Sequence, residues 1–270
     1  MSKALLQFLA LAGCFFALWY SLSRFDFVKK FHVEEVTREE EHKLGDVVLE
    51  AACSGHEEIR SDTVLDCLNS IKHRLCAANG IADSTIKIHL IKDDDINAFS
   101  LPDNHLLIYS GLIDYCKSPE ELAGVMAHEI GHIEAKHVMK KLVKDVGLAM
   151  LATLAGGQAG GEIARQVAQT LSSTAFDREQ ESEADAAAVH ILAKANIDPR
   201  CLADFLFRLS QEKADMPKSF ELISDHPNSK DRSAEILELR KKEHYAAQQV
   251  LNDDEWKTLK GDAESVDLPR

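Results

Sequence analysis

The chain has 270 residues and a formal net charge of −14, with 45 acidic residues against 31 basic ones. An acidic chain that has no basic stripe interleaved with aromatic residues is poorly suited to nucleic acid, so we expect no nucleic-acid partner. With 45% hydrophobic and 28% charged residues, the composition is typical of a globular protein with a buried core and excludes a disordered chain.

The first thirty residues differ from the rest of the chain. The segment Ala4–Ser23 carries no charge, and twenty helical residues span about 30 Å, which is the thickness of a bilayer core. Trp19 and Tyr20 near its end are residue types that favour the membrane interface. We therefore expect a membrane anchor within residues 1–30. A cleaved signal peptide and a lipoprotein signal ending at Cys14 are the alternatives.

Two rules disagree on the side of the membrane. Lys3 alone precedes the apolar segment, whereas Arg24, Lys29 and Lys30 follow it, and the positive-inside rule then places the body in the cytoplasm. A signal-like first segment instead favours export. We expect the body on the periplasmic or another extracytoplasmic side, and the cytoplasmic side stays open.

The body, residues 31–245, is predicted to be one domain of the α+β class with mainly helical structure. Residues 246–270 are predicted to be a surface helix and a loose tail. Apolar residues at helical spacing predict helices over Thr37–Cys53 and over residues 61–79, and Gly80 ends the second. The cysteines are scattered without a CxxC pair, which favours free thiols over a disulfide framework.

A small antiparallel sheet is predicted to follow these helices. The alternating, β-branched run over residues 85–93 is typical of a strand. Asn97–Leu101 and His105–Ser110 are two further strand-like runs, and the residues of a tight turn, Pro102–Asn104, separate them. We therefore expect these two runs to form a hairpin.

The next helix carries a motif that has chemical meaning. It is predicted to begin at Pro119 after the N-cap residue Ser118. Within it, His128, Glu129 and His132 form H-E-x-x-H. Residues four apart share one helix face, so both imidazoles can reach one zinc ion at about 2.0–2.1 Å. The glutamate points about 100° away, where it can reach a water molecule on the open side of the metal.

A short motif also arises by chance, so a third metal ligand is the test of this interpretation. The longer motif H-E-x-x-H-x-x-G-x-x-H is absent, because Ala135 and Val138 stand where its glycine and its last histidine would be. We predict that His137, one position earlier, is a histidine on the helix surface. The third ligand must then come from elsewhere in the chain.

A helix predicted over Phe176–Ala195 supplies three candidate glutamates, at positions 179, 181 and 183. Glu181 has an aspartate one turn further on, Asp185, which can orient a ligand imidazole through its other ring nitrogen. The small residues Ala184 and Ala188 beside this face would bring it against the core. We therefore predict Glu181 as the third ligand of one Zn²⁺ ion per chain. A solvated acidic helix start is the alternative.

Three segments in this order resemble a known family. "HEIGHIEAKH", "DREQESEAD" and "DHPNSKDR" are similar to the zinc metallopeptidases grouped with the heat-shock protease HtpX, the CAAX prenyl proteases, LoiP and BepA. The resemblance extends over about residues 37–243 and implies a zincin-like metallopeptidase domain. "NAFSLPDNHLLIYSGLI" is similar to the strand pair that precedes the metal-binding helix in this family, although "PDN" replaces the usual glycine-rich turn.

The resemblance also implies roles for individual residues. It implies that His128, His132 and Glu181 are the zinc ligands, that Glu129 is the general base, and that Asp185 is the partner of a ligand histidine. His226 in "DHP" is implied to be an active-site histidine. As an imidazole donor it would stabilise the oxyanion of the reaction, and as a fourth ligand it would hold the enzyme latent.

The same resemblance implies a place for the substrate. Asn97, Ala98 and Phe99 would belong to an edge strand that lines the cleft, and an extended polypeptide would add to this strand through main-chain hydrogen bonds. Such binding tolerates many sequences. An ordinary core hairpin is the alternative.

We therefore expect a membrane-anchored zinc endopeptidase of protein quality control that acts on unfolded or membrane-associated polypeptides. A chaperone-like or regulatory module that binds metal with little turnover is the first alternative. A membrane-tethered adaptor whose motif is accidental is the second. Zinc content separates the last hypothesis from the others, and loss of casein cleavage on Glu129→Gln separates the first two.

Overall fold

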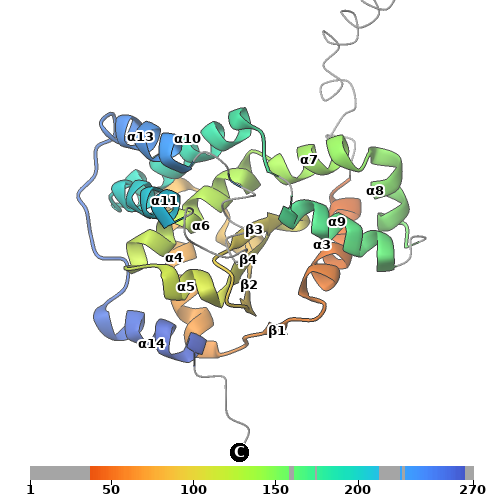
Figure 1. Cartoon of the computed structure of the whole chain (residues 1–270), viewed down its shortest axis with the longest axis horizontal. Helices are drawn as coiled ribbons and strands as arrows, with labels where there is room; N and C mark the ends of the chain where they lie inside the picture. Colours follow the sequence, from red (N-terminus) through yellow and green to blue (C-terminus); the bar gives the residue numbers. More distant parts are fainter. Residues whose placement is uncertain (1–36, 158–160, 174, 213–225, 227–228, 265–270) are drawn as a thin grey trace, which may run out of the picture. The chain divides into compact units, whose positions relative to one another are not determined.

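Helices make up most of the described chain, and a small sheet lies among them (Figure 1). The computed structural model describes residues 37–157, 161–173, 175–212, 226 and 229–264. The helices are α3 (Arg38–Cys53), α4 (Asp62–Asn79), α5 (Ser110–Tyr115), α6 (Pro119–Glu134), α7 (His137–Asp145), α8 (Leu148–Ala155), α9 (Gly161–Ser173), α10 (Arg178–Lys194), α11 (Arg200–Glu212), α13 (Ser229–Arg240) and α14 (Asp253–Glu264). The strands are β1 (Glu57–Glu58), β2 (Lys87–Lys92), β3 (Ala98–Leu101) and β4 (His105–Tyr109).

The expected membrane anchor within residues 1–30 lies outside the described residues. Among the helices of the described ranges, none combines the length and the apolar character that a bilayer crossing requires. The described residues from Arg38 onward belong to one compact unit.

The sheet has the strand order β1-β2-β4-β3, and its pairing is mixed. The hairpin prediction is confirmed, because β3 and β4 pair in antiparallel register with Phe99 opposite Leu107. The prediction of a purely antiparallel sheet is wrong, because β2 and β4 run parallel with His89 opposite Leu107. After β2 the chain forms β3, the outer strand, and then turns back to form β4. Strand β4 therefore lies between β2 and β3 and runs parallel to β2. Strand β3 is thereby left at the edge of the described sheet.

The hairpin tip explains why Asp and Asn follow the proline. Asp103 and Asn104 both adopt the left-handed conformation, with φ of 61° and 58°. Asn and Asp tolerate this region better than other side-chain-bearing residues. The Asp103 carboxylate also accepts hydrogen bonds from Lys87 and His42, which hold the tip against β2 and α3.

The main core lies between the sheet and helices α4, α6, α10 and α11. On α4, Val64, Leu68, Ile71 and Leu75 recur at helical spacing and are fully buried. One sheet face adds apolar side chains to this core, among them Leu90, Leu106 and Ile108. The prediction that α4 ends at Gly80 is confirmed, since this residue has a φ of 70° and its N–H group reaches back to the last turn.

Helix α6 is held on its other side by α11. Arg208 donates two hydrogen bonds of 2.7 Å to the carboxylate of Glu121, and its guanidinium lies over the ring of Tyr115. The free thiols that the cysteine pattern predicts are found at each of the five cysteines in the described ranges.

The C-terminal stretch contributes a helix and two leucines to the core. Helix α14 lies against α4 and α5, and Leu251 and Leu259 are buried in the core. The helix predicted within residues 246–270 is α14, and these two leucines anchor it to the core. Residues 265–270 lie outside the described part of the chain.

Candidate metal centre

Helix α6 carries both motif histidines, and its start is fixed by local interactions. The Ser118 side chain accepts a hydrogen bond from the backbone N–H group of Glu121, and Pro119 occupies the first turn, as predicted. The helix is buried along nearly its whole length because it passes between the sheet, α4, α10 and α11. His128 and His132 lie one turn apart, and their Nε2 atoms are 3.1 Å from each other.

Helix α10 brings the predicted carboxylate to this pair. Asp177 caps the helix and forms a capping box with Gln180. Glu181 is buried, and its oxygens lie 3.7 Å from His128 Nε2 and 3.4 Å from His132 Nε2. The two helices approach closely at Gly131, where a Cβ atom would lie only 3.0 Å from the carbonyl oxygen of Ala184.

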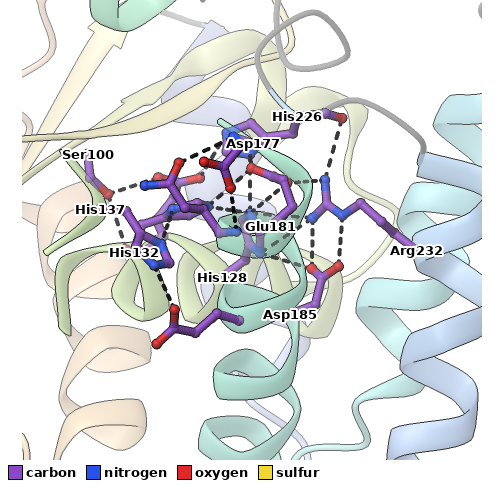
Figure 2. A network of polar contacts seen from close by, with 12 residues as sticks. Ser100, His128, His132, His137, Asp177, Glu181, Asp185, His226 and Arg232 are labelled. Atoms are coloured by element: carbon purple, nitrogen blue, oxygen red, sulfur yellow. Dashed lines mark hydrogen bonds and ion pairs between the residues drawn. The ribbon is translucent and has the colours of Figure 1, made fainter. Parts of the chain in front are cut away.

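A fourth donor atom completes the group. His226 Nδ1 is 3.2 Å from His128 Nε2 and 2.8 Å from the Glu181 carboxylate. One donor atom from each of His128, His132, Glu181 and His226 lies within 4.8 Å of all the others, and Figure 2 shows these side chains converging. In a tetrahedral zinc site with bonds of about 2.0–2.1 Å, neighbouring donors are separated by about 3.3 Å. The observed separations of 2.8–3.7 Å therefore fit such a site.

The charge of the site also fits a divalent cation. Three carboxyl groups, those of Glu129, Glu181 and Asp185, are buried here, and one guanidinium, that of Arg232, is buried with them. The formal excess is two negative charges, and uncompensated buried charge is costly. Two imidazoles and a carboxylate are typical ligands of zinc. A Zn²⁺ ion would supply the missing positive charge.

The protonation states suit metal binding. Burial holds the pKa of His132 well below its ordinary value, so its imidazole is neutral and has a lone pair to offer. Burial alone would raise the pKa of Glu181, but the charges of His226 and Arg232 outweigh it and lower that pKa strongly. Glu181 is therefore an ionised carboxylate at any physiological pH.

Asp185 and Arg232 support the first ligand histidine from behind. Asp185 Oδ1 is 3.0 Å from Nδ1 of His128, which leaves the Nε2 atom of that ring directed toward Glu181. Arg232 donates two hydrogen bonds of 2.7 Å to the Asp185 carboxylate, and its Nη1 atom is 2.6 Å from Glu181. Burial raises the pKa of Asp185, but Arg232 more than compensates and the result is about 2. The only indication of this arginine in the sequence is its place at the end of "DHPNSKDR".

Glu129 lies beside the group without belonging to it. Its side chain is 0% exposed, and its Oε2 atom accepts a 2.8 Å hydrogen bond from the Ser100 hydroxyl. Its Oε1 atom has no hydrogen-bond partner among the described residues and lies 3.5 Å from His226 Nε2. Sequence reasoning missed Ser100, although it alternates with Phe99 on β3 and therefore faces α6.

Glu181 and Glu129 also act on His226. Burial opposes a charged imidazole, but the two carboxylates outweigh it, so the pKa of His226 is raised. The pocket of acidic side chains around this ring therefore favours a cation, whether a proton or a metal ion occupies it.

The prediction for His137 is wrong. It is 0% exposed, and its Nδ1 atom lies 3.0 Å from Nδ1 of His132. The prediction assumed that α6 continues, but α6 ends at Glu134 and Lys136 adopts a φ of 54°. The chain turns there, and α7 begins with its first side chain directed back toward the motif. The Phe176 ring stacks on the ring of His132, with 4.1 Å between the two centroids.

The residues predicted to bind substrate lie on β3 or directly before it. Asn97, Ala98 and Phe99 are all buried, so their side chains are not offered to a partner. What β3 offers is its main chain, since it is an edge strand of the described sheet. The hydrogen bond from Ser100 to Glu129 places this edge directly beside the candidate base.

An H-E-x-x-H helix whose two imidazoles meet a glutamate from a second helix is the arrangement of a metallopeptidase of the zincin type. The family model described as "Peptidase family M48" matches residues 66–240 of the chain. The chain therefore belongs to peptidase family M48, and the resemblance seen in the three sequence segments is confirmed.

Curated relatives share this region. Mitochondrial metalloendopeptidase OMA1 of Schizosaccharomyces pombe is 28% identical over 173 residues, which are 63% of this chain and 51% of that protein. The beta-barrel assembly-enhancing protease of Escherichia coli is 26% identical over 212 residues, 73% of this chain and 43% of that protein. The chain thus spans about half or less of the length of these relatives.

Proposed function

We propose that this chain is a zinc-dependent endopeptidase in which His128, His132 and Glu181 hold the metal and Glu129 is the general base. The observation that carries the proposal is the convergence of these three donors, from helices α6 and α10, beside a buried carboxylate. A zinc ion held here would polarise a peptide carbonyl and lower the pKa of a water molecule.

The residues of the chain then have separate tasks. Ser100 occupies Oε2 of Glu129, which leaves Oε1 to accept the proton of the attacking water and later to pass it to the departing amine. Asp185, fixed by Arg232, holds His128 in orientation. The edge of β3 would align an extended polypeptide beside Glu129 through main-chain hydrogen bonds, which tolerate many sequences.

For His226, the distances favour the role of a fourth ligand over that of an oxyanion donor. Its Nδ1 atom lies as near to the other donors as they lie to one another. Catalytic zinc sites keep one position open, whereas sites with four protein ligands are closed. We infer that the described arrangement is a latent form and that His226 must leave this position before substrate binds. His226→Ala should then raise peptidase activity, whereas loss of an oxyanion donor would lower it by about 10²–10³-fold.

The deciding experiment measures zinc content and casein cleavage by the purified full chain. Glu129→Gln should keep about one zinc per chain and lose cleavage, and Glu181→Ala should lose both. Glu134→Gln, an exposed glutamate at the end of the same helix, is the matched control and should change neither. Zinc binding with unchanged hydrolysis in Glu129→Gln would contradict the mechanism. Zinc binding without any hydrolysis, both in the unaltered chain and in His226→Ala, would favour the chaperone-like alternative.

We further propose that the chain is anchored through residues 1–30 with its body on the extracytoplasmic side, and that it clears unfolded or membrane-associated polypeptides. The uncharged segment Ala4–Ser23 supports the anchor, and the names of the relatives, which refer to mitochondria and to β-barrel assembly, support a role in quality control at membranes. The double variant Leu9→Lys/Leu11→Lys should release the full chain from membranes at alkaline pH. Continued membrane retention would refute the anchor.

A further inference from the structure

The imidazole of His137 and the carboxylate of Glu183 lie in line behind His132, on the side away from the other donors. We propose that these two residues form a relay that positions His132 for metal binding. The inference rests on the proposed metal centre, and it assigns a task to two residues that the reaction itself does not use.

The contacts form an unbroken chain. His132 Nδ1 is 3.0 Å from His137 Nδ1 (Figure 2). His137 Nε2 is 3.1 Å from an oxygen of Glu183. His137 is the first residue of α7, and Glu183 lies on α10 two residues beyond Glu181. The relay therefore ties α7 to the two helices that carry the metal donors.

A proton inventory fixes the tautomer of each ring. The Nε2 atom of His132 faces His128 and Glu181, so it is the metal-binding atom and must carry no proton. In a neutral ring the proton is then on Nδ1, and it can be donated only to an acceptor. His137 Nδ1 must be that acceptor, so its own proton is on Nε2, where the Glu183 carboxylate accepts it. Every contact thus has one donor and one acceptor.

The two ligand histidines are therefore supported in different ways. His128 contacts a buried carboxylate directly, that of Asp185. His132 contacts a neutral imidazole, and the carboxylate at the outer end, that of Glu183, is 59% exposed. A solvated carboxylate acts weakly over this distance, so the relay contributes orientation more than charge. Stacking on Phe176 restrains the same ring from its face.

The test compares zinc affinity and the visible spectrum of the cobalt(II) form in the full chain carrying Glu129→Gln, so that hydrolysis plays no part. His137→Phe removes the acceptor and keeps the volume, and it should weaken zinc binding about 10–100-fold and alter the cobalt bands. His137→Asn places an amide oxygen near the position of Nδ1 and should restore most of the affinity. Glu183→Ala should give a smaller loss, and it should add nothing in the His137→Phe background.

Glu179→Ala is the control, since Glu179 is exposed one turn earlier on the same helix. It should bind zinc like the unaltered chain. Urea unfolding with chelator present checks that each variant folds. Zinc affinity within about twofold in a folded His137→Phe variant, with unchanged cobalt bands, would overturn the relay. Tight zinc binding without hydrolysis, both in the unaltered chain and in His226→Ala, contradicts only the proposed function. Absence of zinc binding in the unaltered chain overturns both.

Discussion

The spacing of α6 and α10 can be perturbed by one methyl group, through Gly131→Ala. A Cβ atom at Gly131 would lie 3.0 Å from the carbonyl oxygen of Ala184 and 3.1 Å from Cβ of Ala187, both on α10. Ordinary contacts of a Cβ atom begin at 3.4 Å, so the helices must separate by a few tenths of an ångström. Metal–ligand distances vary by only about 0.2 Å, so this separation of the helices would move Glu181 too far from the metal to coordinate it well.

Two measurements separate the effect on packing from the effect on the metal. We expect the over-packed interface to lower the free energy of unfolding by about 1–3 kcal/mol, measured in urea with chelator present. We expect zinc affinity, measured by competition with a chromogenic chelator, to fall by about 10–100-fold.

Gly124→Ala is a matched control on the same helix. Its Cβ atom would lie 3.1 Å from Cβ of Leu202 on α11, a contact as tight as the one at Gly131, but α11 carries none of the predicted ligands. It should lower the free energy of unfolding by a similar amount and leave zinc affinity unchanged. If Gly131→Ala destabilises the fold yet binds zinc as tightly as Gly124→Ala, the α6–α10 spacing does not set the geometry of the centre.

Three further predictions concern charge and metal. Arg232→Met leaves the carboxylates of Asp185 and Glu181 buried without their partner, so urea unfolding with chelator should show a loss of about 3–5 kcal/mol, and saturating zinc should reduce that loss. Burial, with Lys87 and His89 nearby, lowers the pKa of His105 from 6.5 to about 4, so the neutral ring is favoured in the folded state. The contribution of His105 to the free energy of unfolding should therefore be complete above pH 6.5 and fall by about 3 kcal/mol as the pH drops to 4. His105→Asn should flatten the dependence of the free energy of unfolding on pH over this range. An unchanged slope in that variant would refute the prediction. Chelation should lower the free energy of unfolding by about 4 kcal/mol relative to zinc at a thousandfold excess over its Kd, and it should have no effect in Glu181→Ala.

Local patterns in the sequence predicted the elements well. Helical spacing on α4, the turn residues at 102–104 and the cap at Ser118 each act within a few residues, so they can be read without knowing the fold. The parallel pairing of β2 with β4 could not be predicted in this way, because it depends on where the hairpin returns relative to a strand outside it.

The candidate site was predictable where residue type and spacing define a ligand set. Ser100 and Arg232 contribute through contacts with residues far away in the sequence, Glu129 at 29 positions and Asp185 at 47 positions, and no local pattern marks such contacts. His137 shows a different limit. The direction of its side chain could be predicted from helical geometry only if α6 continued through residue 137. The left-handed conformation of Lys136 ends that helical geometry and gives the His137 side chain a different direction.

The acidic start of α10 shows how one short segment serves a whole site. A helix N-terminus attracts acidic residues for electrostatic reasons alone, which made a solvated surface the natural alternative. In the structure three alternate residues have three different partners: Glu181 lies among the donors, Glu183 contacts His137, and Asp185 contacts His128. Glu179 stays exposed. Glu181 and Asp185 are four residues apart, so they share the helix face that is directed toward the imidazoles of His128 and His132. Glu183 lies between them in the sequence and contacts His132 only indirectly, through His137. The cluster of acidic residues at the start of α10 therefore reflects contacts that support both ligand histidines, and the helix dipole alone does not account for it.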